Sequence, residues 1–276
     1  MVWKILRPSL WTIFNALSRI SLRRGDYRCI FILGHMRAGS TLLAHVLANH
    51  TECAGAGETH LSYQMPSDLP NLALKTCQML HNPLLRRRYF VDQINHPYVS
   101  DDVLLSTRIY KCIILLREPG STLKSMMSLS IWSEKEAVEI YVKRLKQLLH
   151  YGIILGGRAI LVEYEDLVDR TQQTLDRLTD FLGFDPPLTP NYTTHRMTGR
   201  IPGFGDPSDN IKTGHIIRTP SHSITISKEA LDRATLAYGD YREQIRAATV
   251  RSELSGSSSE GGDIILLKER RASDRQ

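Results

Sequence analysis

The sequence predicts an α/β fold, in which a central parallel sheet carries helices on both faces and forms a single three-layer domain. Short apolar runs occur within 27–34, 110–119 and 158–167, and each has the length of a fully buried strand. Segments with the apolar spacing of helices follow these runs. Ligands of such sheets bind at the carboxyl ends of the strands, so the residues that follow each run are the first candidates for function.

Composition and charge limit the classes of function. The chain has 276 residues, 42% hydrophobic and 23% charged, which is ordinary for a soluble globular protein. Its net charge of +6 favours an anionic ligand or surface, but no nucleic-acid signature accompanies it. The ten histidines lack the spacing of a zinc site, and no metal is expected. Four scattered cysteines without a C-x-x-C pair indicate reduced thiols and a cytoplasmic protein.

Residues 1–24 form a separate feature, because they alternate apolar and basic residues and contain no acidic residue. No apolar run here approaches the roughly 20 residues that span a bilayer. A basic amphipathic helix lying on a membrane surface is one interpretation. A helix docked on the domain is the other, and we favour it.

The remaining elements follow from apolar spacing and from glycine and proline positions. Helices are expected over 67–95 with interruptions at Pro70 and Pro83, over 121–129, over 133–152 with its end at Gly152, over 171–183, and from Ser227 onward. Residues 185–222 are too long for an ordinary connection, and the tail 251–276 has the composition of a disordered segment. The expected domain therefore covers 25–250.

The first candidate site is the loop after the first run, where residues 34–41 read G-H-M-R-A-G-S-T. A P-loop reads G-x-x-x-x-G-K-[ST], so Ser40 stands in place of the lysine. Gly34 and Gly39 allow the backbone to approach an anion, and the following helix directs its dipole at it. Arg37 supplies the positive charge, and Thr41 adds a hydroxyl group. A turn without function is the alternative interpretation.

The second candidate site follows the run within 110–119, where Arg117 stands in place of the aspartate that holds Mg²⁺ in many P-loop enzymes. An arginine suits a second phosphate group instead. Ser125 lies two helical turns further on, on the same face. The alternatives are a buried ion pair of Arg117 with Glu118 or Glu163, and a surface position for Ser125. Two separate phosphate sites indicate a nucleotide that carries a 5′- and a 3′-phosphate.

These motifs resemble those of the cytosolic and bacterial sulfotransferases, which use 3′-phosphoadenosine 5′-phosphosulfate, over about residues 28–245. Residues 37–41 are similar to the 5′-phosphosulfate loop, so the resemblance implies cofactor contacts by Arg37, Ala38, Gly39, Ser40 and Thr41. Arg117-Glu118-Pro119 with Ser125 resembles the 3′-phosphate motif, and Tyr164 stands where the family contacts adenine. The stretch 199–216 resembles the late loop that closes over the cofactor, which adds Arg200. His35, Met36 and Ala38 depart from the family pattern.

The catalytic base remains open between three residues. Glu58 follows the segment where a second strand is expected to end, and it resembles a Gly-Glu position whose Glu acts as base in some family members. His96 resembles the base of other members, although Gln93 replaces their lysine. His60 is the third candidate. We rank Glu58 first, followed by His96 and His60, while Arg37 neutralises the developing charge.

The expected function is transfer of a sulfuryl group to a hydroxyl or amine of an unidentified acceptor, which can be a small molecule, a glycan or a lipid. A P-loop kinase for a small metabolite and a catalytically silent nucleotide-binding protein are the alternatives. Neither nucleic acid nor a metal is expected as a partner. A peripheral membrane contact through residues 1–24 stays open, as does the oligomeric state.

Overall fold

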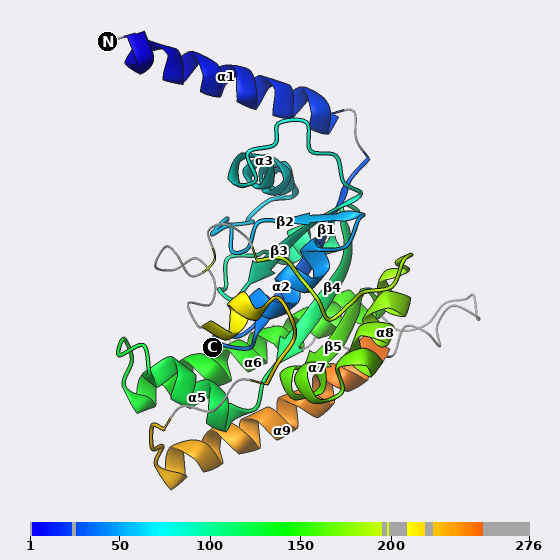
Figure 1. Cartoon of the computed structure of the whole chain (residues 1–276). Helices are drawn as coiled ribbons and strands as arrows, with labels where there is room; N and C mark the ends of the chain where they lie inside the picture. Colours follow the sequence, from blue (N-terminus) through cyan, green and yellow to red (C-terminus); the bar gives the residue numbers. More distant parts are fainter. Residues whose placement is uncertain (1, 24–25, 195–197, 199–208, 219–222, 251–276) are drawn as a thin grey trace, which may run out of the picture.

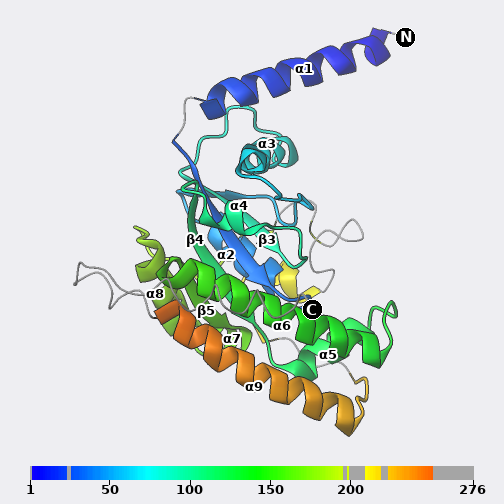
Figure 2. The same ribbon diagram turned by 180° about the vertical axis from the view of Figure 1, so that it is seen from behind.

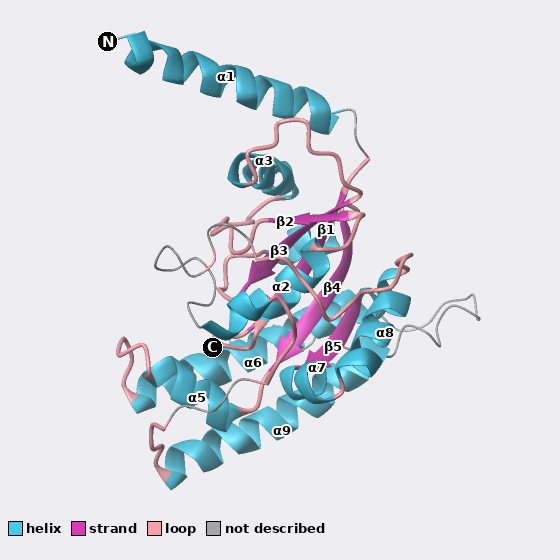
Figure 3. Ribbon diagram, viewed as in Figure 1, coloured by secondary structure: helices cyan, strands magenta, loops and turns pink. Residues whose placement is uncertain are grey.

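The computed structural model describes residues 2–23, 26–194, 198, 209–218 and 223–250. Five parallel strands form its sheet in the order β2-β3-β1-β4-β5. The strands are β1 (Arg28–Gly34), β2 (Cys53–Gly55), β3 (Tyr89–Ile94), β4 (Ile109–Leu116) and β5 (Ala159–Glu163). Figure 3 shows helices on both sides of this sheet. The prediction of a three-layer α/β fold with a parallel sheet is therefore confirmed.

Helices cover the two faces of the sheet unequally. One face carries α2 (Ser40–Ala48), α7 (Tyr164–Asp169) and α8 (Thr171–Leu182). The other carries α3 (Leu69–Met79), α4 (Asp101–Leu105), α5 (Pro119–Met127), α6 (Glu134–Leu155) and α9 (Lys228–Val250). Figure 2 shows α6 and α9 side by side over this second face.

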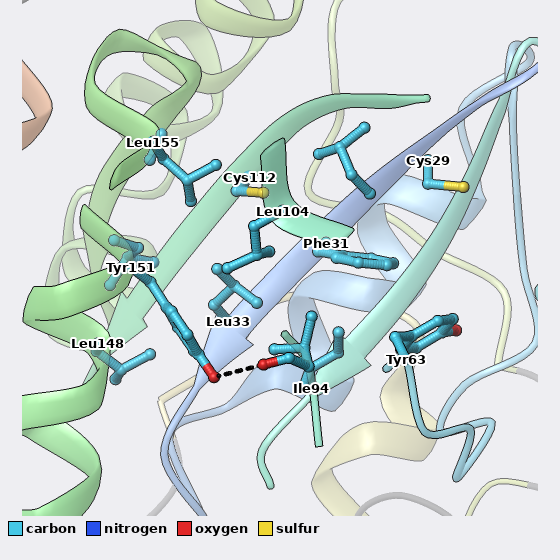
Figure 4. Close-up of a cluster of buried hydrophobic side chains, with 14 of the residues drawn as sticks. Cys29, Phe31, Leu33, Tyr63, Ile94, Leu104, Cys112, Leu148, Tyr151 and Leu155 are labelled. Atoms are coloured by element: carbon cyan, nitrogen blue, oxygen red, sulfur yellow. Dashed lines mark hydrogen bonds between the residues drawn. The ribbon is translucent and has the colours of Figure 1, made fainter. Parts of the chain in front are cut away.

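The alternation of side chains along β1 explains why both faces are buried. Cys29, Phe31 and Leu33 belong to one hydrophobic cluster, whereas Ile30 and Ile32 belong to the other. Figure 4 shows the first three side chains on the side that faces α6. Because successive strand residues point to opposite faces, a continuous apolar run is what a strand buried on both sides requires.

Two predictions about elements are wrong. The segment 67–95 is helical only over α3, and its end forms β3, which lies between β2 and β1. Helix α6 does not end at Gly152 but continues to Leu155. Gly152 is buried inside the helix, where a Cβ atom would come within 3.4 Å of Ile114. That distance is ordinary van der Waals contact, so Gly152 is an interior helix residue packed against β4 and does not end the helix.

The N-terminal residues form α1 (Val2–Arg23), which the remainder of the domain contacts at its C-terminal half (Figure 1). Ser18 and Ser21 are buried, and the side chain of Asn15 accepts a hydrogen bond of 2.9 Å from Gln78 Nε2 of α3. The C-terminal half of α1 is therefore docked on the domain, as the favoured interpretation predicts. No helix within the described part of the chain is both long and apolar enough to span a bilayer. The division at residues 24 and 250 stays a prediction.

Candidate functional site

The candidate site lies where β1, β4 and β5 end. Strand β1 is followed by the loop 35–39 and α2, and β4 by Arg117, Glu118 and α5. Strand β5 passes directly into α7, which begins at Tyr164. The three motifs predicted from the sequence therefore lie at one edge of the sheet.

The loop after β1 has an unusual backbone. Gly39 has a φ of 92°, and a Cβ atom on it would lie 2.5 Å from the ring of Tyr164. Both the positive φ and the close ring require glycine. Arg37 also has a positive φ, 63°, which is uncommon for a non-glycine residue. Such conformations cluster at binding sites, which favours function over the alternative of a turn without one.

The two predicted phosphate sites are in direct contact. Arg37 donates from Nε to Ser125 Oγ at 2.8 Å, and Arg117 donates from Nη1 to the backbone oxygen of Arg37 at 3.2 Å. The Arg117 guanidinium also lies 4.2 Å from the centre of the Tyr164 ring. Ser125 is almost fully buried, so it is not the surface serine of the alternative interpretation. The structure thus brings residues from three strand ends into one cluster with two cationic groups.

Neither carboxylate considered as a partner of Arg117 is paired with it. Glu118 accepts from the backbone nitrogens of Gly120 and Ser121 and so caps α5. Glu163 binds Arg242 and Arg246 of α9 instead. Among the described residues, Arg117 Nε is buried without a hydrogen-bond partner. A buried unsatisfied donor is costly, and a phosphate oxygen is the kind of group that would satisfy it.

His35 links the two loops, a role that sequence reasoning missed. Its Nε2 accepts a hydrogen bond of 2.9 Å from the backbone nitrogen of Arg117, and its Nδ1 lies 2.9 Å from the backbone oxygen of Met36. These partners fix the neutral tautomer in which Nδ1 carries the proton. Burial lowers the pKa of His35 to about 4, so the ring stays neutral at physiological pH. The only sequence signal was its departure from the family pattern.

The hydroxyl groups of the first loop are bonded to the end of β3 and the residue after it. Asn95 donates to Ser40 Oγ at 2.9 Å, and Thr41 Oγ1 donates to Gln93 Oε1 at 3.4 Å. Ala38 is completely buried against the second cluster. These contacts hold the start of α2 rigidly over the adjacent strand, so the helix N-terminus has a fixed direction.

The loop that carries Glu58 and His60 is held by a buried aspartate. Asp92 of β3 accepts hydrogen bonds from Thr59 Oγ1 at 2.5 Å and from Tyr63 Oη at 2.6 Å. Burial raises the pKa of Asp92 to about 6, although these hydrogen bonds act in the opposite direction. Thr59 is buried while the neighbouring Glu58 is half-buried. The anchor therefore fixes the backbone on which the first-ranked base stands.

The structure places His96 close to the same loop but occupies its basic nitrogen. Burial, the charge of Arg144 and the charge of His60 lower the pKa of His96. Its Nδ1 accepts a hydrogen bond of 3.2 Å from the backbone nitrogen of Tyr98. In the neutral ring Nε2 then carries the proton, so neither nitrogen is available to accept one. This geometry supports the ranking of Glu58 above His96.

Arg144 of α6 is a second residue that sequence reasoning missed. It is buried, and it donates from Nε to the backbone oxygen of Gly34 at 2.8 Å and from Nη2 to that of Ile94 at 2.7 Å. It therefore places a positive charge beneath the loop that begins after Gly34. Its position on the apolar face of α6, between Tyr141 and Leu148, was the available signal.

The late loop is only partly described. Arg200, predicted to bind the cofactor, lies outside the described residues, as does all of 199–208. Thr198, just before it, lies 3.0 Å through Oγ1 from Nε2 of His45 on α2. The start of this loop is thus attached to the helix that follows the first phosphate loop.

Comparison with known proteins supports the resemblance over part of the chain. A model described as "Sulfotransferase family" matches residues 29–90, which include all of β1 except Arg28, the first loop and Glu58. The sulfotransferase domain from the curacin biosynthetic pathway is 22% identical and covers 77% of this chain and 98% of its own, with a TM-score of 0.48. Mouse sulfotransferase SULT7A1, complexed with PAP, is 14% identical, with coverage of 83% and 85% and a TM-score of 0.43. None of the curated proteins compared with the chain matches it.

Proposed function

We propose that this protein is a sulfotransferase that moves a sulfuryl group from 3′-phosphoadenosine 5′-phosphosulfate to a hydroxyl or amine of an acceptor. The observation that carries the proposal is the joined cluster of Arg37, Ser125 and Arg117 at the ends of β1 and β4. Two cationic side chains, a helix N-terminus and a buried hydroxyl suit a ligand with two phosphate groups. The family match over 29–90 supports the same activity.

The residues proposed to bind the sulfuryl donor have side chains and backbone groups that suit phosphate. Arg37 and the backbone at Gly39, Ser40 and Thr41 face the 5′-phosphosulfate, with Ala38 contributing only backbone. Arg117 and Ser125 hold the 3′-phosphate, and the unpartnered Nε of Arg117 offers one of the donors. Tyr164 packs against both sites, and its contact with adenine stays part of the proposal, as does the contribution of Arg200.

The reaction needs a base, a stabilised transition state and a neutralised leaving group. Glu58 takes the proton of the acceptor hydroxyl, whose oxygen forms a bond to sulfur. The bond between sulfur and the 5′-phosphate oxygen breaks, and its electron pair stays on that phosphate. Arg37 and the N-terminus of α2 stabilise the charge that develops there.

The acceptor class and compartment remain parts of this proposal. A small molecule, glycan or lipid with a free hydroxyl or amine is the expected acceptor. The four cysteines are all free and buried, which supports a cytoplasmic protein.

The deciding experiment incubates the protein with ³⁵S-labelled donor and a panel of hydroxyl- and amine-bearing acceptors. Appearance of labelled product that Arg37→Ala abolishes supports the proposal. In parallel, ATP and Mg²⁺ are supplied with the same acceptors, because ATP consumption there would establish the kinase alternative. Tight nucleotide binding without transfer to any acceptor would instead identify a silent binding protein.

A further inference from the structure

The exposed face of α1 carries a row of large apolar side chains. Leu10, Ile13, Leu17 and Ile20 are exposed to 63%, 55%, 41% and 50%. Their spacing of three and four residues places them along one side of the helix. The side that faces α3 is different, since Ser18 and Ser21 are buried there. The row is thus an apolar face that the described part of the domain leaves uncovered.

The segment that carries this row is basic, and Arg19 and Arg23 of α1 are exposed. Residues 1–24 hold five basic residues, Lys4, Arg7, Arg19, Arg23 and Arg24, and no acidic one. The segment 80–88 passes beside the C-terminal end of α1 in both views of the ribbon (Figures 1 and 2). It adds an exposed leucine, Leu84, and the exposed residues Arg86, Arg87 and Arg88, of which Arg88 is paired with Glu52 at 3.2 Å.

We propose that α1 and the segment 80–88 form a docking surface for an anionic lipid bilayer. An amphipathic helix binds such a surface by inserting its apolar face among the acyl chains while its basic residues contact the headgroups. Each basic residue near an anionic surface strengthens this attraction. The apolar row meets the first requirement, and the exposed arginines of α1 and of 86–88 meet the second.

Charge complementarity favours an anionic bilayer over two other candidate partners of this surface, a second copy of α1 and the segment 251–276. A second copy of α1 would bring two positive segments together without any acidic residue between 1 and 24 to compensate them. The segment 251–276 holds five basic and five acidic residues, so it offers no net negative charge to this surface. An anionic bilayer offers both the apolar layer and the negative charge.

Flotation of the full-length protein with vesicles tests the proposal. We expect binding to vesicles of phosphatidylcholine with about 30% phosphatidylserine, weak binding to phosphatidylcholine alone, and loss of binding at high salt. The double variant Ile13→Asn/Leu17→Asn should reduce partitioning roughly tenfold or more, since the helix loses much of its insertable area. Arg86→Gln/Arg87→Gln should reduce it by about fivefold for each charge and leave residual binding that salt affects less.

The matched control is Ile153→Asn/Leu236→Asn, which removes two apolar side chains of α6 and α9 that are even more exposed than Ile13 and Leu17, and it should bind like the wild type. The comparisons between lipids and between salt concentrations use the wild-type protein. They therefore test the proposal even if a variant unfolds. Failure of the wild type to bind anionic vesicles overturns the proposal. So does a concentration-dependent dimer that Ile13→Asn/Leu17→Asn dissociates, or vesicle binding that appears only after removal of 251–276. Sulfuryl transfer plays no part in any of these measurements.

Discussion

Arg37 and Ser125 are hydrogen-bonded at 2.8 Å although 88 positions separate them in the chain. Arg37 belongs to the loop after β1, and Ser125 belongs to α5, which follows β4. Their contact joins two motifs that the sequence predicts as separate phosphate sites. The nucleotide-binding predictions follow from this joint cluster.

Arg117→Ala should weaken binding of 3′,5′-adenosine bisphosphate by about ten- to a hundredfold, because a charge-assisted hydrogen bond is worth roughly 1.5–3 kcal/mol. Binding of 5′-AMP should change little, since that ligand lacks the 3′-phosphate. Isothermal titration calorimetry with both ligands measures the difference. Equal affinity of the wild-type protein for the two ligands would show that the two-phosphate interpretation is wrong.

Glu58→Gln should reduce turnover by about two to four orders of magnitude, the usual contribution of a general base, while nucleotide affinity stays unchanged. Glutamine keeps the shape and the hydrogen-bonding ability of the side chain but cannot take the proton. His96→Ala is the matched control and should retain most activity. A silent His96→Ala variant beside an active Glu58→Gln variant would transfer the role to His96.

Activity should survive EDTA, because Arg37 and Arg117 carry the charge that neutralises the phosphates in the proposed mechanism. The rate of transfer from ³⁵S-labelled donor is measured before and after chelation, with added Mg²⁺ as the second arm. An absolute requirement for Mg²⁺ would contradict this prediction and favour the kinase alternative.

His35 should make the free energy of unfolding depend on pH. Burial holds its pKa near 4 in the folded protein, against about 6.5 in the unfolded chain. The unfolded state therefore binds more protons between these values, so this contribution is fully present above about pH 6.5 and is lost as the pH falls toward 4. The slope reaches about 1.4 kcal/mol per pH unit.

Asp92 acts in the opposite direction over much of the same range, since its pKa is raised to about 6 and its contribution is lost as the pH rises. The measurement must therefore compare wild type with His35→Gln, which can still accept from Arg117 but does not titrate. We expect the stability advantage of the wild type over this variant to shrink from pH 6.5 to 4.5 in urea denaturation. A constant difference would mean that His35 is not held neutral.

The sequence was sufficient to predict the strands that consist of long apolar runs and the motifs that follow them. Strand β3 was missed because Tyr89–Ile94 contains Asp92 and Gln93, two polar residues within a fully buried strand. Their burial depends on partners from elsewhere, Thr59 and Tyr63 for Asp92 and Thr41 for Gln93. The pattern of polar and apolar residues within one segment does not reveal which distant residues will bond to its polar side chains.

Some residues of the candidate site could likewise be predicted from the sequence, and others could not. Arg37, Arg117 and Ser125 were found because a short motif with fixed spacing carries each of them. His35 and Arg144 were missed because both act through backbone atoms of distant residues, Arg117 for the first and Gly34 and Ile94 for the second. Every residue carries the same backbone groups, so a side chain that bonds to the backbone has no partner that can be recognised by residue type.

The bridge that Arg144 makes between Gly34 and Ile94 has a consequence for how acceptor preference can diverge. Gly34 precedes the loop proposed to bind the donor, and Ile94 is followed closely by His96, one of the candidate bases. The Arg144 guanidinium therefore fixes the distance between the loop after β1 and the end of β3. In the proposed sulfotransferase, we therefore expect replacements in the loops beyond Glu58 and His96 to change acceptor contacts without altering this distance. If the proposed function holds, acceptor preference can change through these loops while the geometry of the loop after β1 stays the same.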